Sequence, residues 1–101
     1  MKNKNPTSEN ILKSIEKHRK DIRSYGVKRI GLFGSHLKGT SHKKSDLDLL
    51  VTFYQPTFDN YMGLKFFLER LFRRKVDLVI EESLKPAFRY VKKEAMYASE
   101  L

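Results

Sequence analysis

Apolar side chains recur at helical spacing over the first quarter of the chain, with charged side chains between them. Thr7 or Ser8 can cap such a helix, and Gly26 is a residue type that often ends one. The apolar positions are Ile11, Leu12, Ile15, Ile22 and Tyr25. Their spacing predicts one amphipathic helix that ends at Gly26. Residues 1–6, which precede it, are expected to form a flexible tail.

Farther along, the pattern changes to one that is typical of strands. Residues 27–33 and 75–80 each read as a short strand, and residues 46–53 alternate clearly between two faces. One face of the 46–53 segment would hold Leu47, Leu49, Val51 and Phe53, and this composition predicts burial. The other face would hold Asp46, Asp48, Leu50 and Thr52. In the 75–80 strand, Asp77 would point away from the core.

Two further helices are expected. The first would begin at Thr57 or Asp59, end near Phe72 and pack an apolar stripe against the sheet. The second would cover residues 84–98, where apolar side chains return at helical spacing and Pro86 suits the first turn.

The order of these elements predicts an α/β fold. A strand, a long helix and another strand in succession indicate a crossover, so the strands at 46–53 and 75–80 would be neighbours or would flank a mixed sheet. The expected architecture is one domain over residues 1–101: a small mixed sheet with helices on one face and the aspartates on the other.

Composition adds charge to this picture. Of the 101 residues, 40% are hydrophobic and 33% are charged, which fits a folded globular chain. The formal net charge of +9 favours an anionic partner, and the alternative is a basic surface kept for solubility. The chain has no cysteine, its start lacks the apolar core of a signal peptide, and no apolar run approaches membrane-spanning length. A cytoplasmic location without a membrane partner is therefore expected.

The candidate chemistry lies where the first strand ends and the second begins. Gly34 and Ser35 follow the first strand, and backbone amides at such a turn can bind an anionic group when no bulky side chain blocks the approach. Asp46 and Asp48 are two residues apart, so both carboxylates point to one face of the strand, with Cα atoms roughly 6.5–7 Å apart. Carboxylates so placed can converge on divalent ions. A phosphate-binding turn beside a carboxylate metal site predicts nucleotidyl transfer.

These residues also form a pattern of fixed spacing. Gly34 and Ser35 are followed by three residues and Gly39, and then by five residues and Ser-Asp-Leu-Asp at 45–48. The pattern resembles the signature of the DNA polymerase β-like nucleotidyltransferases. The short chain resembles their minimal branch (MNT), whose members are often antitoxins paired with HEPN-domain toxins. With a third matching segment near the end, the resemblance extends over about residues 25–80.

The resemblance implies roles for three aspartates. Asp46 and Asp48 would hold the metal ions. Asp77, in the third matching segment, would share a metal and accept the proton of the attacking hydroxyl. The alternative for Asp77 is a strand-end ion pair with Lys75 or Arg74.

Five neighbouring positions complete the candidate site. Gly34 and Ser35 would bind the phosphates of the nucleotide, with Lys38 as a further contact. Ser45 would be a turn residue that sets the approach of the first aspartate. His36 occupies a position where relatives often carry arginine, and it would be a neutral hydrogen-bonding residue at the mouth of the site or an exposed side chain.

By resemblance, the expected activity is Mg²⁺-dependent transfer of AMP from ATP to a hydroxyl, with two metal ions. The acceptor would be a tyrosine of a HEPN-family ribonuclease toxin, so the protein would act as an antitoxin. Larger relatives carry a second, helical domain for the acceptor, and this chain would need a partner chain or a homo-oligomer instead. Two alternatives stay open: an antitoxin that acts by stoichiometric binding alone, and a basic nucleic-acid-binding module, for which the sequence shows no recognition motif.

Overall fold

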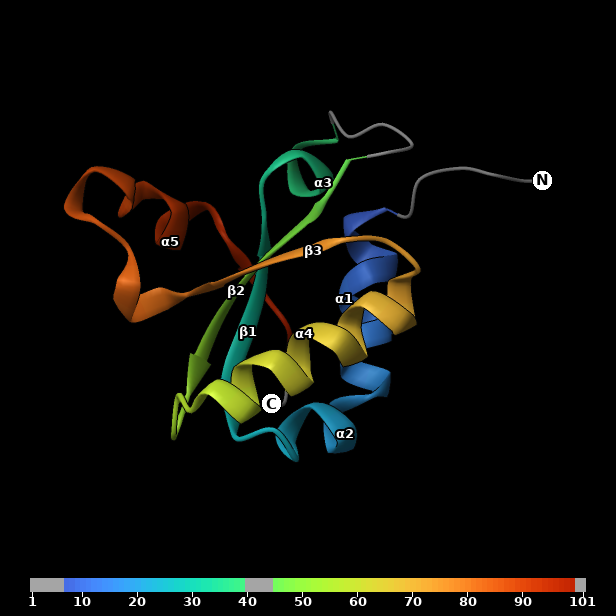
Figure 1. The fold of residues 1–101 in the computed structure, drawn as a ribbon. Coiled ribbons are helices and arrows are strands. Elements are labelled where there is room, and N and C mark those ends of the chain that lie inside the picture. Colours follow the sequence, from blue (N-terminus) through green and yellow to red (C-terminus); the bar gives the residue numbers. More distant parts are fainter. Residues whose placement is uncertain (1–6, 40–44, 100–101) are drawn as a thin grey trace.

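A four-stranded sheet forms the centre of the computed structural model, which describes residues 7–39 and 45–99 (Figure 1). The order across the sheet is β3-β2-β1-β4. β1 runs antiparallel to both of its neighbours, and β2 runs parallel to β3. The predicted mixed sheet is confirmed, and the two strands of the crossover are neighbours. The strands are β1 (Val27–Phe33), β2 (Leu47–Phe53), β3 (Val76–Ile80) and β4 (Met96–Tyr97).

Three helices pack against one face of this sheet (Figure 1). They are α1 (Ser8–Lys17), α2 (Arg19–Arg23) and α4 (Phe58–Phe72). Of the two predicted caps of α4, Thr57 and not Asp59 is the one observed: its hydroxyl accepts a hydrogen bond from the Asn60 N–H at 3.1 Å. Thr7 caps α1 in the same way. Within residues 7–39 and 45–99, no helix combines the length and the apolar character that a membrane span requires.

The first predicted helix is in fact two, and the prediction of one continuous helix was wrong. At His18 the backbone leaves the helical region, with φ −103° and ψ 24°. The ring Nδ1 of His18 lies 2.8 Å from the Ser14 carbonyl oxygen, so the side chain satisfies a carbonyl at the end of α1. The apolar positions on both helices are buried as expected.

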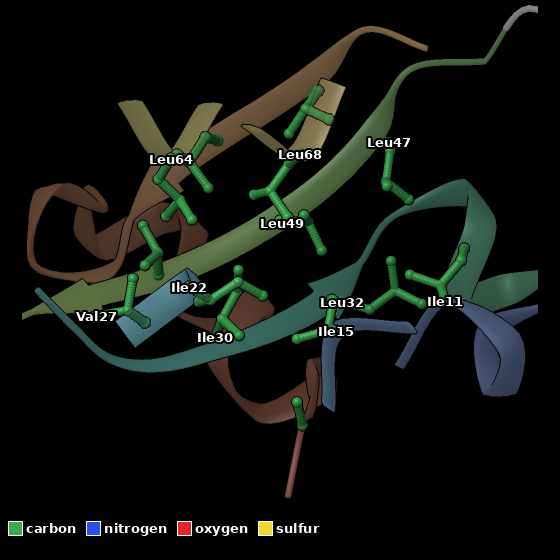
Figure 2. Close-up of a cluster of buried hydrophobic side chains, with 14 of the residues drawn as sticks. Ile11, Ile15, Ile22, Val27, Ile30, Leu32, Leu47, Leu49, Leu64 and Leu68 are labelled. Atoms are coloured by element: carbon green, nitrogen blue, oxygen red, sulfur yellow. The ribbon is translucent and has the colours of Figure 1, made fainter. Parts of the chain in front are cut away.

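The core lies between the helices and the sheet (Figure 2). Leu47, Leu49 and Val51 of β2 are fully buried there, which confirms the predicted core face of that strand. Leu64 and Leu68 of α4 pack against them from the helical side. Because each fully buried aliphatic side chain stabilises a fold by about 1.5–3 kcal/mol, this layer holds β2 firmly in place.

The C-terminal segment differs from the prediction of a helix over residues 84–98. After β3 the chain forms two 3₁₀ turns (Glu81–Ser83 and Pro86–Phe88), a short helix α5 (Tyr90–Glu94) and then β4. The reason is tertiary. Tyr97 packs its ring directly over Gly31 of β1, and the Ala98 N–H donates to the Ile30 carbonyl at 2.9 Å, so the end of the chain pairs with the sheet instead of continuing a helix.

Glu81 anchors this segment on the face of the sheet opposite the helices. Its carboxylate, only 7% exposed, contacts Arg29 at 2.8 Å and Lys92 at 3.2 Å. The hydroxyls of Tyr97 and Thr52 donate to it at 3.0 and 3.3 Å. Burial acts to raise the pKa of Glu81, but these hydrogen bonds and the charge of Arg29 outweigh it, so the pKa lies below its usual value. The network explains why Thr52 is buried on this face, although the aspartates farther along are not covered.

Candidate active site

Asp48 and Asp77 lie side by side on neighbouring parallel strands, because the register pairs them directly. Adjacent strands are about 4.8 Å apart, so the two side chains leave the same face of the sheet next to one another. Asp46, two residues before Asp48, lies at the start of the same face. Asp46 and Asp77 are exposed and Asp48 is half-buried. The structure therefore brings Asp48 and Asp77 together, and Asp46 lies near enough for its charge to affect Asp48.

The Asp48 carboxyl has an unusual charge environment. Its pKa is raised from 3.8 to about 6 by burial first, then by the negative charges of Asp77 and Asp46 and by a hydrogen bond with Asp77. Negative charge is thus crowded at this point of the sheet. A cation bound here would relieve the repulsion and favour the ionised carboxylate.

Gly34 brings backbone directly against Asp48. Its φ of +79° is a conformation that L-residues with a side chain rarely adopt. A Cβ at this position would collide with the Asp48 carboxylate. After Gly34 the chain turns into the short helix α3 (Ser35–Lys38), which Gly39 ends with a φ of +74°. Only glycine fits at position 34, because its backbone lies against Asp48. The expected approach of this backbone to a phosphate stays a prediction.

The donor set suits a magnesium ion that a bound nucleotide helps to coordinate. Within residues 7–39 and 45–99, no three acidic or histidine side chains are arranged closely enough to hold a metal by themselves. Mg²⁺, however, is usually held by one or two carboxylates together with water and substrate phosphates. Asp48 and Asp77 supply such a carboxylate pair, and the Gly34 backbone lies directly against Asp48.

The remaining predicted residues lie around this pair. Lys38 is exposed and its Nζ lies 3.7 Å from Glu94, across to α5. The carbonyl of Ser45 accepts a hydrogen bond from Arg74 at 3.4 Å. Among the described residues no ion pair joins Asp77 to a lysine or arginine, so the alternative of a strand-end ion pair is not seen.

For His36, two alternatives were expected: a neutral hydrogen-bonding side chain or an exposed one. Its side chain is only 3% exposed, so the exposed alternative was wrong. Its Nε2 lies 2.9 Å from Nη1 of Arg74. Burial first, and then the charge of Arg74, lower the pKa of His36, while the backbone of Asp46 acts in the opposite direction. The ring is therefore neutral near pH 7.

Arg74 is the residue at this site that sequence reasoning missed. In the sequence it figures only as an alternative ion-pair partner of Asp77. It stands in a basic run, Arg73-Arg74-Lys75, whose members look alike in the sequence. No local signal separates the one that turns inward toward His36.

Paired aspartates beside a glycine turn on a small mixed sheet fit the nucleotidyltransferases that the sequence resembles, and comparisons with known proteins show this class. The family profile described as "Nucleotidyltransferase domain" matches residues 15–100. The protein adenylyltransferase MntA of Thermococcus cleftensis is 37% identical over 94 residues, which are 90% of this chain and 95% of that protein. A Methanocaldococcus jannaschii protein named as a candidate protein adenylyltransferase is 34% identical over 83% of this chain and 100% of its own.

Solved structures show the same relationship. One described as a candidate minimal nucleotidyltransferase is 36% identical, with a TM-score of 0.68 over 84% of this chain and 93% of its own. A toxin–antitoxin crystal structure with AMP-PNP contains a chain of TM-score 0.71, and at 24% identity this likeness concerns the fold alone. The protein belongs to the minimal nucleotidyltransferase family.

Proposed function

We propose that this protein is a protein adenylyltransferase that transfers AMP from ATP to the hydroxyl of a tyrosine on a HEPN-family ribonuclease toxin. The observation that carries the proposal is the pairing of Asp48 with Asp77 beside the Gly34 backbone. The relatives named for protein adenylylation, which match nearly the whole chain, support the choice of nucleotide and of a protein acceptor.

The roles of the residues follow from their places. Asp46, Asp48 and Asp77 would hold Mg²⁺, with two ions when the nucleotide is bound. The bound ions would neutralise the charge of the triphosphate. The Gly34 and Ser35 amides, with the Ser35 hydroxyl, hold the leaving phosphates. The tyrosine oxygen attacks the α-phosphorus, the bond from that phosphorus to the bridging oxygen breaks, and pyrophosphate leaves.

The acceptor proton and the remaining charges also need partners. Asp77 is exposed on the open face of the sheet, where an acceptor hydroxyl can reach it, and it takes the proton. Lys38, exposed on α3, adds a positive charge for the phosphates, and Ser45 sets the approach of Asp46.

AMP on the toxin would block it, which makes the protein its antitoxin in the cytoplasm. The partner chain, or a second copy of this chain, provides the surface that orients the acceptor. The positive charge of +9 favours association with an acidic partner surface as well as with ATP.

The test is a labelling reaction with whatever protein encoded beside this one co-purifies with it. ATP labelled at the α-phosphate, or in parallel at the γ-phosphate, is added with Mg²⁺. Label should reach the partner from α-labelled ATP only. The Asp46→Asn, Asp48→Asn double variant should give none.

A matched control is the Asp21→Asn, Asp59→Asn double variant, which makes the same charge change on two surface helices and should label normally. If the partner stays unlabelled yet bound and inhibited, the catalytic proposal is wrong and neutralisation occurs by binding. Label on RNA ends instead of protein would keep the chemistry and replace the acceptor.

A further inference from the structure

We propose that His36 and Arg74 are positioning residues that lock the three backbone segments of the site to one another. The segments are the Gly34–Ser35 turn, the start of β2 and the start of β3. The inference rests on the proposed function, because it concerns the placement of the same aspartates, but it is tested by a separate measurement.

The two residues come from distant parts of the chain. His36 lies in α3, directly after Ser35, and Arg74 lies just before β3, 38 residues later. The 2.9 Å hydrogen bond between their side chains is largely removed from solvent, since His36 is 3% exposed. Arginine only donates, so Nε2 of His36 accepts, and the ring must be neutral with its proton on Nδ1. The bond joins the turn to β3.

The His36–Arg74 pair also contacts the backbone at the start of β2. Nη1 of Arg74 also donates to the Ser45 carbonyl at 3.4 Å, a long and weak contact by itself. The backbone of Asp46 faces the His36 ring closely enough to affect its pKa. Both residues that precede β2 therefore touch the His36–Arg74 pair.

Asp46 is the aspartate that needs such support. The ladder between β2 and β3 begins at Leu47, and the ladder between β1 and β2 ends at Asp48. Asp48 and Asp77 are thus placed by the sheet itself, whereas Asp46 lies one residue beyond it. A metal ligand that is loose by about 1 Å binds poorly, so contacts outside the sheet must hold this backbone.

The pair carries an energetic penalty that packing alone does not explain. Nε of Arg74 is buried without a hydrogen-bond partner among the described residues. A buried donor without a partner destabilises a fold, because it has lost its hydrogen bond to water. Two apolar side chains would fill the space without this penalty. A polar pair at this place is explained if its hydrogen bonds fix the positions of the turn, the start of β2 and the start of β3.

The test compares His36→Leu, His36→Gln and Arg74→Met with wild-type protein. Binding of Mg²⁺ is titrated by calorimetry in the presence of a non-hydrolysable ATP analogue, and amide exchange is followed for Ser45 to Asp48. Residues that orient metal ligands affect metal affinity by about 10–100-fold. We expect His36→Leu and Arg74→Met to weaken Mg²⁺ binding at least about tenfold and to speed exchange at these amides.

His36→Gln restores an acceptor for Arg74 and should recover affinity to within about threefold of wild type. The matched control is His18→Leu, since His18 also bonds a backbone carbonyl but lies between α1 and α2. Its loss should lower stability without changing Mg²⁺ affinity. If His36→Leu does not fold, Arg74→Met and His36→Gln provide the same comparison.

Three outcomes would contradict the proposed positioning role of His36 and Arg74. The first is a His36→Leu variant with the Mg²⁺ affinity and amide exchange of the His18→Leu control. The second is weakened nucleotide binding in Arg74→Met alone, which would make Arg74 a direct phosphate ligand. The third is failure of His36→Gln to recover. Because the readouts are binding and exchange, they decide the lock even if no AMP transfer is found, and transfer activity separately decides the proposed function.

Discussion

Removal of the Asp48 charge should stabilise the metal-free protein while it abolishes the proposed activity. The Asp48 pKa of about 6, against 3.8 ordinarily, means that the folded state disfavours the ionised carboxylate. A difference of one pKa unit corresponds to about 1.36 kcal/mol, so the charge opposes folding by at most about 3 kcal/mol at pH 7. Solvent and salt screen a half-exposed group, and we expect Asp48→Asn to raise the free energy of unfolding by about 1–2 kcal/mol.

The dependence on pH has a definite sign. Because the folded-state pKa is the higher one, the native protein binds more protons than the unfolded chain between about pH 4 and pH 6. Wild-type stability from this group therefore falls as the pH rises through that window and is constant above it. The Asn variant lacks this change, so the gain should be full at pH 7.5 and nearly absent at pH 4.

The assay is urea unfolding in EDTA at several pH values, with Asp21→Asn as a control for an exposed aspartate. A gain of 1 kcal/mol would also raise the melting temperature by about 4–8 °C in a domain of this size. Added Mg²⁺ and ATP should stabilise wild type but not Asp48→Asn. An Asn variant that is less stable than wild type at pH 7.5, or a gain that persists at pH 4, would refute the reasoning.

Two other predictions concern Gly34 and Glu81. Gly34→Ala should lower the free energy of unfolding by about 1–3 kcal/mol and eliminate ATP binding in a calorimetric titration. The control Gly39→Ala also lies at positive φ, in the less strained left-handed helical region (ψ 15° against −154° at Gly34), and no described residue lies near its Cβ. Equal loss of ATP binding in both variants would contradict the role of the Asp48 contact. Glu81→Gln should lower the free energy of unfolding by about 2 kcal/mol at pH 7. Because the folded pKa is depressed, this contribution is present above about pH 4.5 and is lost as the pH falls through the lower folded value. In urea unfolding, the difference between variant and wild type should therefore shrink as the pH is lowered below 4.5.

The sequence by itself determined the main elements and the candidate catalytic residues. The alternation in residues 46–53 placed four apolar side chains in the core and Asp46 and Asp48 on the other face, and the burial of the strand agrees. The spacing from Gly34 to these aspartates predicts the candidate site through the family signature that it resembles. Both inferences depend on local regularities, the two-residue period of a strand and a fixed spacing in one turn, which leave a trace in the sequence.

Tertiary structure decided which strands pair and which distant residues are in contact, because local sequence patterns do not determine either. Whether β2 and β3 are neighbours, and hence whether Asp77 reaches Asp48, depends on strand pairing. The burial of His36 depends on Arg74, and the strand at the C-terminus depends on Gly31 and Glu81. These contacts join residues that are far apart in the chain. They depend on the fit of side-chain shape and charge in space, and such a fit produces no periodic pattern in the sequence. For that reason the helical spacing at residues 84–98 predicted a helix that the sheet edge replaced with a strand.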